Sequence, residues 1–350
     1  MDKIPVAVLG ATGAVGQRFV QLLADHPWFE ISALTGSERT VGGVYREVCR
    51  WVLNGDIPPE ISEMVVSTTD ASLPARIVFS ALPNRVARQV EPTLAENGYI
   101  VCSNASAFRQ EPDVPLIIPE VNSDHLALLE KQRGNRGWPG LLVTSPNCTA
   151  TGLVMTLKPL HDAFGVAQVF ATTLQAVSGA GYPGVPYLDI IENIIPDIHG
   201  EAEKIQDETR LLLGRMDAGQ RVAGDMELSV QTNRVPVFDG HTVNMTIKFD
   251  RPPSPEEAVK ALSGFRGPDP VPGLPSAPAQ PVLVRSEPNR PQPRRDRDAA
   301  AGMAVTVGSI QPCPILDLRM VSVVHNTLRG AASGSILNAE LLVAEGYAKN

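Results

Sequence analysis

The chain has 350 residues, of which 43% are hydrophobic and 19% charged, and its formal net charge is -8 at pH 7. This length exceeds what one ordinary core supports, so we expect about two domains. The acidic balance argues against nucleic acid as the main partner, because no basic stripe would bind phosphates. No apolar run approaches the roughly 20 residues of a membrane span, and the N-terminus lacks the pattern of a signal peptide.

The cysteines have no metal-type or disulfide-framework spacing. They stand far apart in the sequence, at Cys49, Cys102, Cys148 and Cys313. This usage is typical of a reducing compartment. We therefore expect a cytoplasmic protein without a structural metal.

A glycine loop opens the chain between a predicted strand and a predicted helix. Residues 4–9 form a short apolar run, residues 10–16 read GATGAVG, and residues 19–23 have helical spacing. Such glycines let a backbone approach a pyrophosphate that rests on the helix N-terminus. The G-x-x-G-x-x-G spacing is a variant of the dinucleotide fingerprint, and a tight turn without a ligand is the alternative.

The second predicted strand, residues 31–35, is followed by Ser37, Glu38 and Arg39. NAD-binding folds usually place an acid at this strand tip to hold the ribose hydroxyls. A hydroxyl beside a guanidinium suits a 2′-phosphate, so NADP is preferred over NAD. Glu38 could repel that phosphate, and an ordinary charged loop is the alternative.

Strands and helices alternate through the first part of the chain. Residues 77–81, 100–103 and 141–144 are predicted strands, and residues 86–97 are a predicted helix. Repeated units of this kind predict a parallel, doubly wound sheet whose ligands bind at the carboxyl ends of the strands. Ser80, Asn104 and Cys148 fall at those ends.

The pattern changes after Cys148. Residues 243–249 alternate strictly, and residues 305–307 and 318–324 add strands, which predicts a mixed or antiparallel sheet with helices on one face. The proline-rich stretch between Arg251 and Arg297 is interpreted as ordered but irregular, because residues 282–284 form a strand; a disordered linker is the alternative. A last helix over 337–344 is expected to return to the first domain.

Two further features of this part concern assembly. A sheet with one exposed face often buries it against a second subunit. A charged run between Arg290 and Asp298 either borders such an interface or is simply solvated.

The stretch Ser145 to Ala150, SPNCTA, joins the strand 141–144 to a helical pattern. Cys148 is therefore predicted in the first helical turn, where free N–H groups and the helix dipole favour a thiolate. This placement indicates covalent catalysis coupled to hydride transfer. A buried structural thiol is the alternative.

A cysteine nucleophile needs a proton-transferring partner. His241 is preferred, because it opens the alternating strand after a turn and because Arg234, a possible carboxylate anchor, lies seven residues earlier. His199 and His325 flank loops and remain possible. The other histidines, His26, His125 and His161, are interpreted as structural or surface residues.

Motifs along almost the whole chain carry a family resemblance. They include residues 10–16, 103–105 (SNA), 118–122 (IPEVN), 145–149 (SPNCT), 175–181 (QAVSGAG), 193–196 (NIIP), 234–237 (RVPV), 325–327 (HNT) and 335–340 (SILNAE). In these motifs the chain resembles aspartate-semialdehyde dehydrogenases of the archaeal and fungal branch. The resemblance implies an α/β architecture like that of glyceraldehyde-3-phosphate dehydrogenase. Residues 1–147, completed by a C-terminal helix within 329–350, would form a Rossmann-like NADP-binding domain, and residues 148–328 an α+β catalytic and dimerisation domain with a mixed sheet.

The resemblance also implies site residues. Cys148 would be the nucleophile, His241 the acid/base and Gln175 the residue that orients the acyl group. The substrate and phosphate would be bound by Arg109, Asn147, Glu201, Lys204 and Arg234, with Glu201 or Glu208 near the cationic groups. The NADP(H) site would be lined by Gly10, Thr12, Gly13, Ala14, Val15, Ser37, Arg39, Thr40, Ser80, Leu82, Ser178, Gly179 and Asn326.

The implied reaction is NADPH-dependent reductive dephosphorylation of L-aspartyl 4-phosphate to L-aspartate 4-semialdehyde through a thioester, in lysine, methionine, threonine and isoleucine biosynthesis. A homodimer or homotetramer is implied as well. The chain departs from the family pattern at Ala202, where an acid is common, which leaves open which acid meets the substrate ammonium. A related acyl reductase such as a malonyl-CoA reductase is the nearer alternative. A nucleotide-sensing protein without catalysis is the more distant one.

Overall fold

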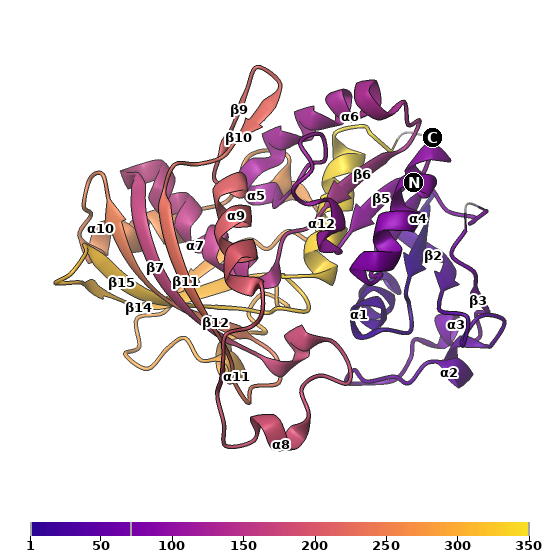
Figure 1. Ribbon diagram of the computed structural model, residues 1–350, viewed down its shortest axis with the longest axis horizontal. Coiled ribbons are helices and arrows are strands. Elements are labelled where there is room, and N and C mark those ends of the chain that lie inside the picture. Colours follow the sequence, from indigo (N-terminus) through magenta and orange to yellow (C-terminus); the bar gives the residue numbers. More distant parts are fainter. Residues whose placement is uncertain (1, 71, 349–350) are drawn as a thin grey trace.

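The computed structural model describes residues 2–70 and 72–348. Two sheets stand side by side, a parallel one on the right of Figure 1 and a mixed one on the left. Helices pack on both, and the C-terminal helix lies between them in this view.

The first sheet contains six parallel strands in the order β3-β2-β1-β4-β5-β6. This arrangement confirms the predicted doubly wound sheet. Its strands are β1 (Ile4–Leu9), β2 (Phe29–Thr35), β3 (Val66–Ser67), β4 (Ile77–Ser80), β5 (Ile100–Ser103) and β6 (Leu141–Thr144). The helices of this part are α1 (Ala14–Leu23), α2 (Tyr45–Val48), α3 (Pro59–Ser62), α4 (Asn84–Glu96), α5 (Pro119–Asn122), α6 (Leu128–Arg136) and α12 (Ala332–Ala344).

Both faces of this sheet are covered, and its strands are mostly apolar and buried. Successive side chains of β1 point to opposite faces. Val6 and Val8 join the core formed with α1 and α12, whereas Ala7 and Leu9 join a separate core with α4. Ligands of such a sheet bind at the carboxyl ends of its strands, where the glycine loop and Cys148 lie.

The C-terminal helix returns to the first sheet. Ile336, Leu337 and Leu341 of α12 are buried in the same core as α1. The predicted start at residue 337 is wrong, since α12 begins at Ala332. Gly334 lies inside this helix, so close to the preceding turn that an added Cβ would lie 2.4 Å from the carbonyl oxygen of Arg329.

The second sheet is mixed and has the strand order β13-β14-β15-β12-β7-β11-β8. Its strands are β7 (Val166–Gln175), β8 (Ile195–Pro196), β11 (Glu227–Arg234), β12 (His241–Phe249), β13 (Val282–Val284), β14 (Val305–Pro312) and β15 (Leu318–Val324). A hairpin, β9 (Arg215–Asp217) and β10 (Gln220–Val222), projects from this part. Its helices are α7 (Cys148–Phe164), α8 (Tyr187–Ile190), α9 (Glu201–Leu212), α10 (Pro255–Gly264) and α11 (Pro293–Asp296).

One face of the second sheet is covered, as predicted. Val243, Met245 and Ile247 of β12 point into a core shared with α7, α9 and α10. The other face carries a shallow depression of about 550 Å³. Phe170, on β7, is 57% exposed on that face, so the rest of the chain leaves more than half of this apolar residue uncovered.

The proline-rich stretch is ordered, which confirms that interpretation over a disordered linker. Ser254 and Glu257 form a reciprocal capping box at the start of α10. Farther along, Asp296 is fully buried and accepts hydrogen bonds from Arg285 and Arg290. The charged run is therefore not wholly solvated, because its central carboxylate is buried and holds the segment together.

Within the described part of the chain, no helix has both the length and the apolar composition that a membrane crossing requires.

Candidate active site

A cleft of about 450 Å³ lies where the two parts of the chain meet. The larger depression on the open face of the second sheet holds no cysteine or histidine among its lining residues, so the cleft is the candidate site. Several predicted site residues line it: Ala14, Val15, Arg109, Asn147, Cys148, Ser178, Gly179 and Asn326.

Cys148 is the first residue of α7, as predicted. Asn147 caps the helix, and its Oδ1 accepts hydrogen bonds from the backbone N–H groups of Thr149 and Ala150, at 2.8 and 3.1 Å. The cap therefore takes up two of the N–H groups that were expected to favour a thiolate, and fewer donors remain for the sulfur.

His241 lies beside the sulfur, at the start of β12. Its Nε2 is 3.2 Å from Cys148 Sγ. On the other side of the ring, the Ala176 backbone N–H donates to Nδ1 over 3.0 Å. Nδ1 must then carry a lone pair, so the neutral ring holds its proton on Nε2, facing the sulfur. His241 is thereby set as a donor toward Cys148.

The other candidate histidines are placed differently. His199 is exposed in the loop before α9. His325 is buried, with Nε2 3.6 Å from Asp298 Oδ1, and it contributes to the field at His241.

Burial acts against the charged form of both partners of the pair. Burial, followed by the charge of Glu201, raises the pKa of the Cys148 thiol to about 12, although Arg109 and Arg234 act in the opposite direction. Burial, followed by the Arg234 guanidinium, lowers the pKa of His241 to about 3. Desolvation therefore opposes the thiolate that the helix N-terminus and the nearby cations favour.

Two arginines from different elements lie near Cys148 and act on its pKa. Arg109 follows β5 and donates from Nη1 to Glu208 over 2.9 Å and from Nη2 to the Asn104 carbonyl over 2.8 Å. Arg234 ends β11 and donates to the Ala176 carbonyl over 2.8 Å. Both guanidinium groups are more than nine-tenths buried, so they are preset cationic anchors.

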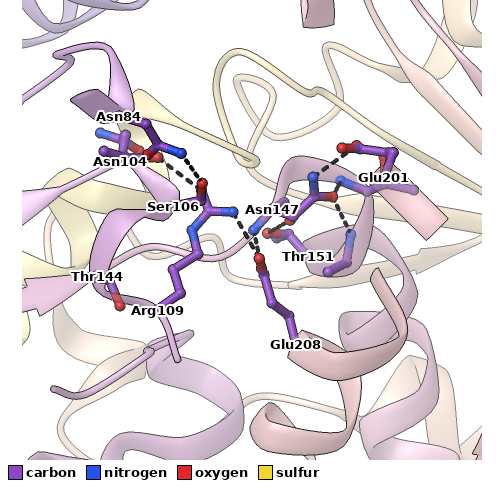
Figure 2. A network of polar contacts seen from close by, with 12 residues as sticks. Asn84, Asn104, Ser106, Arg109, Thr144, Asn147, Thr151, Glu201 and Glu208 are labelled. Carbon is purple, nitrogen blue, oxygen red and sulfur yellow. Dashed lines mark hydrogen bonds and ion pairs between the residues drawn. The ribbon is translucent and has the colours of Figure 1, made fainter. Parts of the chain in front are cut away.

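Glu201 and Lys204 lie on the first turns of α9. Glu201 Oε1 accepts a hydrogen bond from Asn147 Nδ2 over 2.8 Å (Figure 2). Lys204 is exposed and shares a helix face with Glu201, three residues earlier. Ala202 has no carboxylate. In this turn Glu201 is therefore the acid that contacts Asn147, the residue that caps the helix of Cys148.

Gly179 and Gln175 border the histidine and the arginine. An added Cβ on Gly179 would lie 2.9 Å from Arg234 Nη1 and 3.0 Å from His241 Cε1. Gln175 ends β7 beside Arg234 in the parallel register. It is buried, and its Nε2 is 3.4 Å from Thr173 Oγ1.

The glycine loop fits a dinucleotide. Gly10 has a φ of +70° and Gly13 precedes α1. A Cβ on Gly16 would lie 2.1 Å from the Gly10 carbonyl oxygen, so the loop closes tightly over the helix N-terminus. Ala14 and Val15, in the first turn of α1, line the cleft, and no side chain caps this helix. A helix N-terminus of this kind is where a pyrophosphate binds.

Most of the remaining predicted cofactor residues lie near this glycine loop or in the opposite wall of the cleft, which contains Ser178, Gly179 and Asn326. Thr12 and Leu82 lie at the loop; Ser37, Arg39 and Thr40 form the turn after β2, with Ser37 and Arg39 exposed. Asn326 joins the far wall, donating to Ser178 Oγ and accepting from the Gly240 N–H. Ser80 is fully buried and is not among the residues that line the cleft.

Sequence reasoning missed some residues of the cleft. Arg18, one helical turn after Ala14, forms an ion pair of 3.4 Å with Asp239 across the site. The i, i+4 spacing from Ala14 was the available signal. Among the residues that the structure describes, no group of three or more His, Cys, Asp or Glu side chains could hold a metal ion.

Comparisons with known proteins agree with this geometry. Residues 5–129 match the family described as semialdehyde dehydrogenase, NAD binding domain, and residues 157–329 match its dimerisation domain. These ranges lie on either side of the predicted domain boundary at residue 147.

Three relatives were compared over nearly full length. An aspartate-semialdehyde dehydrogenase from Methanothermobacter thermautotrophicus is 51% identical, with 97% of this chain and 99% of the relative covered. The structure of Candida albicans aspartate semialdehyde dehydrogenase with NADP is 40% identical, has a TM-score of 0.90 and covers 98% of this chain and 99% of that one. A malonyl CoA reductase (NADP) from Metallosphaera sedula is less similar, at 38% identity over 98% of each chain.

These identities extend over both domains and over the cleft between them. The family resemblance and the predicted fold class are thereby confirmed. The chain belongs to the aspartate-semialdehyde dehydrogenase family, with relatives in archaea and fungi.

Proposed function

We propose that the chain catalyses the NADPH-dependent reductive dephosphorylation of L-aspartyl 4-phosphate to L-aspartate 4-semialdehyde, a step of the aspartate-derived amino-acid pathway. The observation that carries this proposal is the cysteine–histidine pair, with Sγ and Nε2 3.2 Å apart, set between two buried arginines in a cleft that the dinucleotide loop borders.

The two anionic ends of the substrate match the two arginines. Arg234 would bind the α-carboxylate, and Arg109, with Asn147 and Lys204, would bind the departing phosphate. Glu201 is available for the substrate ammonium. Opposed anchors of this kind hold the acyl carbon at a fixed distance from both ends, which lowers the entropic part of the barrier.

Cys148 would attack the acyl carbon as a thiolate, with its proton leaving on an oxygen of the departing phosphate, and the C–S bond would form as the C–O bond to phosphate breaks. His241 donates from Nε2 to the sulfur, so it stabilises the thiolate before attack and again when the sulfur leaves. An ammonium bound at Glu201 would cancel the carboxylate charge that raises the pKa of Cys148. Substrate binding would thus make the thiol easier to ionise.

Bound NADPH supplies the hydride that reduces the thioester. The glycine loop would hold its pyrophosphate, and Ser37, Arg39 and Thr40 at the tip of β2 would hold the 2′-phosphate. Ser178, Gly179 and Asn326 form the cleft wall nearest Cys148, and Gln175 would orient the acyl group.

The experiment that tests this proposal follows NADPH formation from aspartate semialdehyde, phosphate and NADP. Wild-type protein should turn over, whereas Cys148→Ala should lose turnover and still bind NADPH. Absence of turnover by the wild type would refute the function. A Cys148→Ala variant that kept near-normal rates would refute the covalent route.

The related acyl reductase is the second candidate, since the chain is 38% identical to a malonyl CoA reductase. The buried Arg109 beside the nucleophile favours a small acyl phosphate over a CoA thioester. Rates with malonyl-CoA should therefore be far below those with aspartate semialdehyde and phosphate, and the reverse order would favour the second candidate.

The assembly that we propose is a homodimer or a homotetramer. The match to a dimerisation domain and the exposed apolar side chain of Phe170 on the open sheet face support it. The four free cysteines fit the reducing cytoplasm as the location. Light scattering after gel filtration measures the assembly directly.

A further inference from the structure

Glu208 is a buried carboxylate at the centre of the site, and the proposed reaction assigns it no step. It lies on α9, 1% exposed, two turns after Glu201 on the same helix face. Its Oε1 accepts from Arg109 Nη1 over 2.9 Å, and its Oε2 accepts from the Asn147 backbone N–H over 2.5 Å. Figure 2 shows Asn147 between the two carboxylates, with Arg109 directed at Glu208.

The two groups that Glu208 joins have different origins. Arg109 follows the first sheet, ninety-nine residues before Glu208, whereas Asn147 caps the helix of the nucleophile. A carboxylate with both oxygens occupied by charge-assisted or backbone hydrogen bonds is held firmly in place. Glu208 therefore ties the guanidinium to the turn that precedes Cys148.

The hydrogen bonds of Arg109 leave one edge free. Nη1 is taken by Glu208 and Nη2 by the Asn104 carbonyl. In the described structure Nε is buried without a hydrogen-bond partner, and Arg109 lines the cleft. An oxyanion in the cleft is the kind of group that this orphaned donor requires.

We propose that Glu208 is a positioning residue, which holds Arg109 and the Asn147–Cys148 turn in one fixed relation so that the phosphate and the acyl carbon of one substrate meet them together. The proposal rests on the proposed function. The carboxylate does not touch the substrate; it acts through Arg109 on phosphate and through Asn147 on the nucleophile.

Glu208→Gln tests the proposal with almost no change in volume. The amide keeps one acceptor oxygen in place of two, so its NH₂ group would face one of the two donors that Glu208 now accepts from. We expect the KM for phosphate to rise about tenfold and kcat/KM to fall about 100-fold, as for a misplacement of about 1 Å. The KM for aspartate semialdehyde should change less than twofold, because Arg234 is not involved. Glu203 is an exposed carboxylate on the same helix. The Glu203→Gln variant is therefore the matched control and should behave as wild type.

A double-mutant cycle separates positioning from general loosening of the fold. In an Arg109→Ala background, Glu208→Gln should change the phosphate KM less than twofold. The proposal would be overturned if Glu208→Gln changed the phosphate KM equally in both backgrounds. It would also be overturned if the phosphate KM of Glu208→Gln lay within twofold of the wild-type value. If Glu208→Gln unfolds, Glu208→Asp replaces it, since it keeps the charge at a shorter reach and should show the same selective loss for phosphate.

A readout without turnover distinguishes failure of this proposal from failure of the proposed function. Inorganic phosphate should slow the alkylation of Cys148 by iodoacetamide in the wild-type protein. The reaction at Cys148 is followed by peptide mapping, because Cys313 is also a free thiol. Glu208→Gln should need about tenfold more phosphate for the same protection. Equal protection in both proteins would overturn the role of Glu208, whatever the substrate.

Discussion

Substitution of Gly179 by alanine separates catalytic geometry from stability. A Cβ there would lie 2.9 Å from Arg234 Nη1, 3.0 Å from His241 Cε1 and 3.1 Å from His241 Nε2. Ordinary contacts between heavy atoms lie at about 3.5–4.0 Å, so the guanidinium and the imidazole must each retreat by about 0.5–1 Å. The atoms that give way are the ends of the two side chains that the mechanism needs.

The expected loss follows from that displacement. A misplacement of about 1 Å at a reacting group costs about 100-fold in rate, which corresponds to about 2.7 kcal/mol. Gly179→Ala should therefore lower kcat/KM by about 30- to 100-fold. Because the clash involves side-chain ends rather than backbone, the free energy of unfolding should change by less than about 1 kcal/mol.

The assay is NADPH formation from aspartate semialdehyde and phosphate, together with unfolding in urea. Gly134→Ala is the control, since a Cβ there meets nothing within 4 Å. A Gly179→Ala variant with wild-type kcat/KM would refute the inferred positions of Arg234 and His241. A variant that lost activity only because it unfolded would refute the reasoning on stability.

Four further predictions concern the nucleophile. Gly330→Ala should lower the free energy of unfolding by about 1–3 kcal/mol in urea, because its Cβ would lie 2.6 Å from Cys148 Cβ and 2.8 Å from the Asn326 carbonyl oxygen; wild-type stability would contradict this packing. Asn147→Ala should cost about 0.5–2 kcal/mol in the same measurement through loss of the helix cap. Because the pKa of Cys148 is raised to about 12, its alkylation by iodoacetamide should accelerate about tenfold per pH unit from pH 6 to 10, and a plateau below pH 9 would contradict that pKa. Glu201→Gln should raise the alkylation rate at any one pH in this range, since it removes a charge that raises the pKa.

Local pattern predicted the placement of the main catalytic residues. The apolar run 141–144 followed by helical spacing placed Cys148 at the first position of α7. The strict alternation after a turn placed His241 at the start of β12. Both inferences need only neighbours within a few residues, and such signals survive folding when tertiary packing agrees with them.

The electrostatic state of the site could not be predicted in the same way. It depends on contacts between residues far apart in sequence, such as Ala176 with His241, 65 positions apart, and Glu208 with Asn147, 61 positions apart. The helix N-terminus favours a thiolate, whereas the side chain of Asn147 and the burial of the sulfur act against it. No periodicity in the sequence reports these pairings.

The acyl-thioester on Cys148 is the central claim, and it can be measured directly. Protein mixed with aspartate semialdehyde and NADP, without phosphate, should release a burst of about one NADPH per active site as the thioester accumulates. Mass spectrometry should then find one aspartyl group on the peptide that contains Cys148, and phosphate should remove it. A slow linear rate without a burst, or an unmodified Cys148 after the burst, would contradict the account.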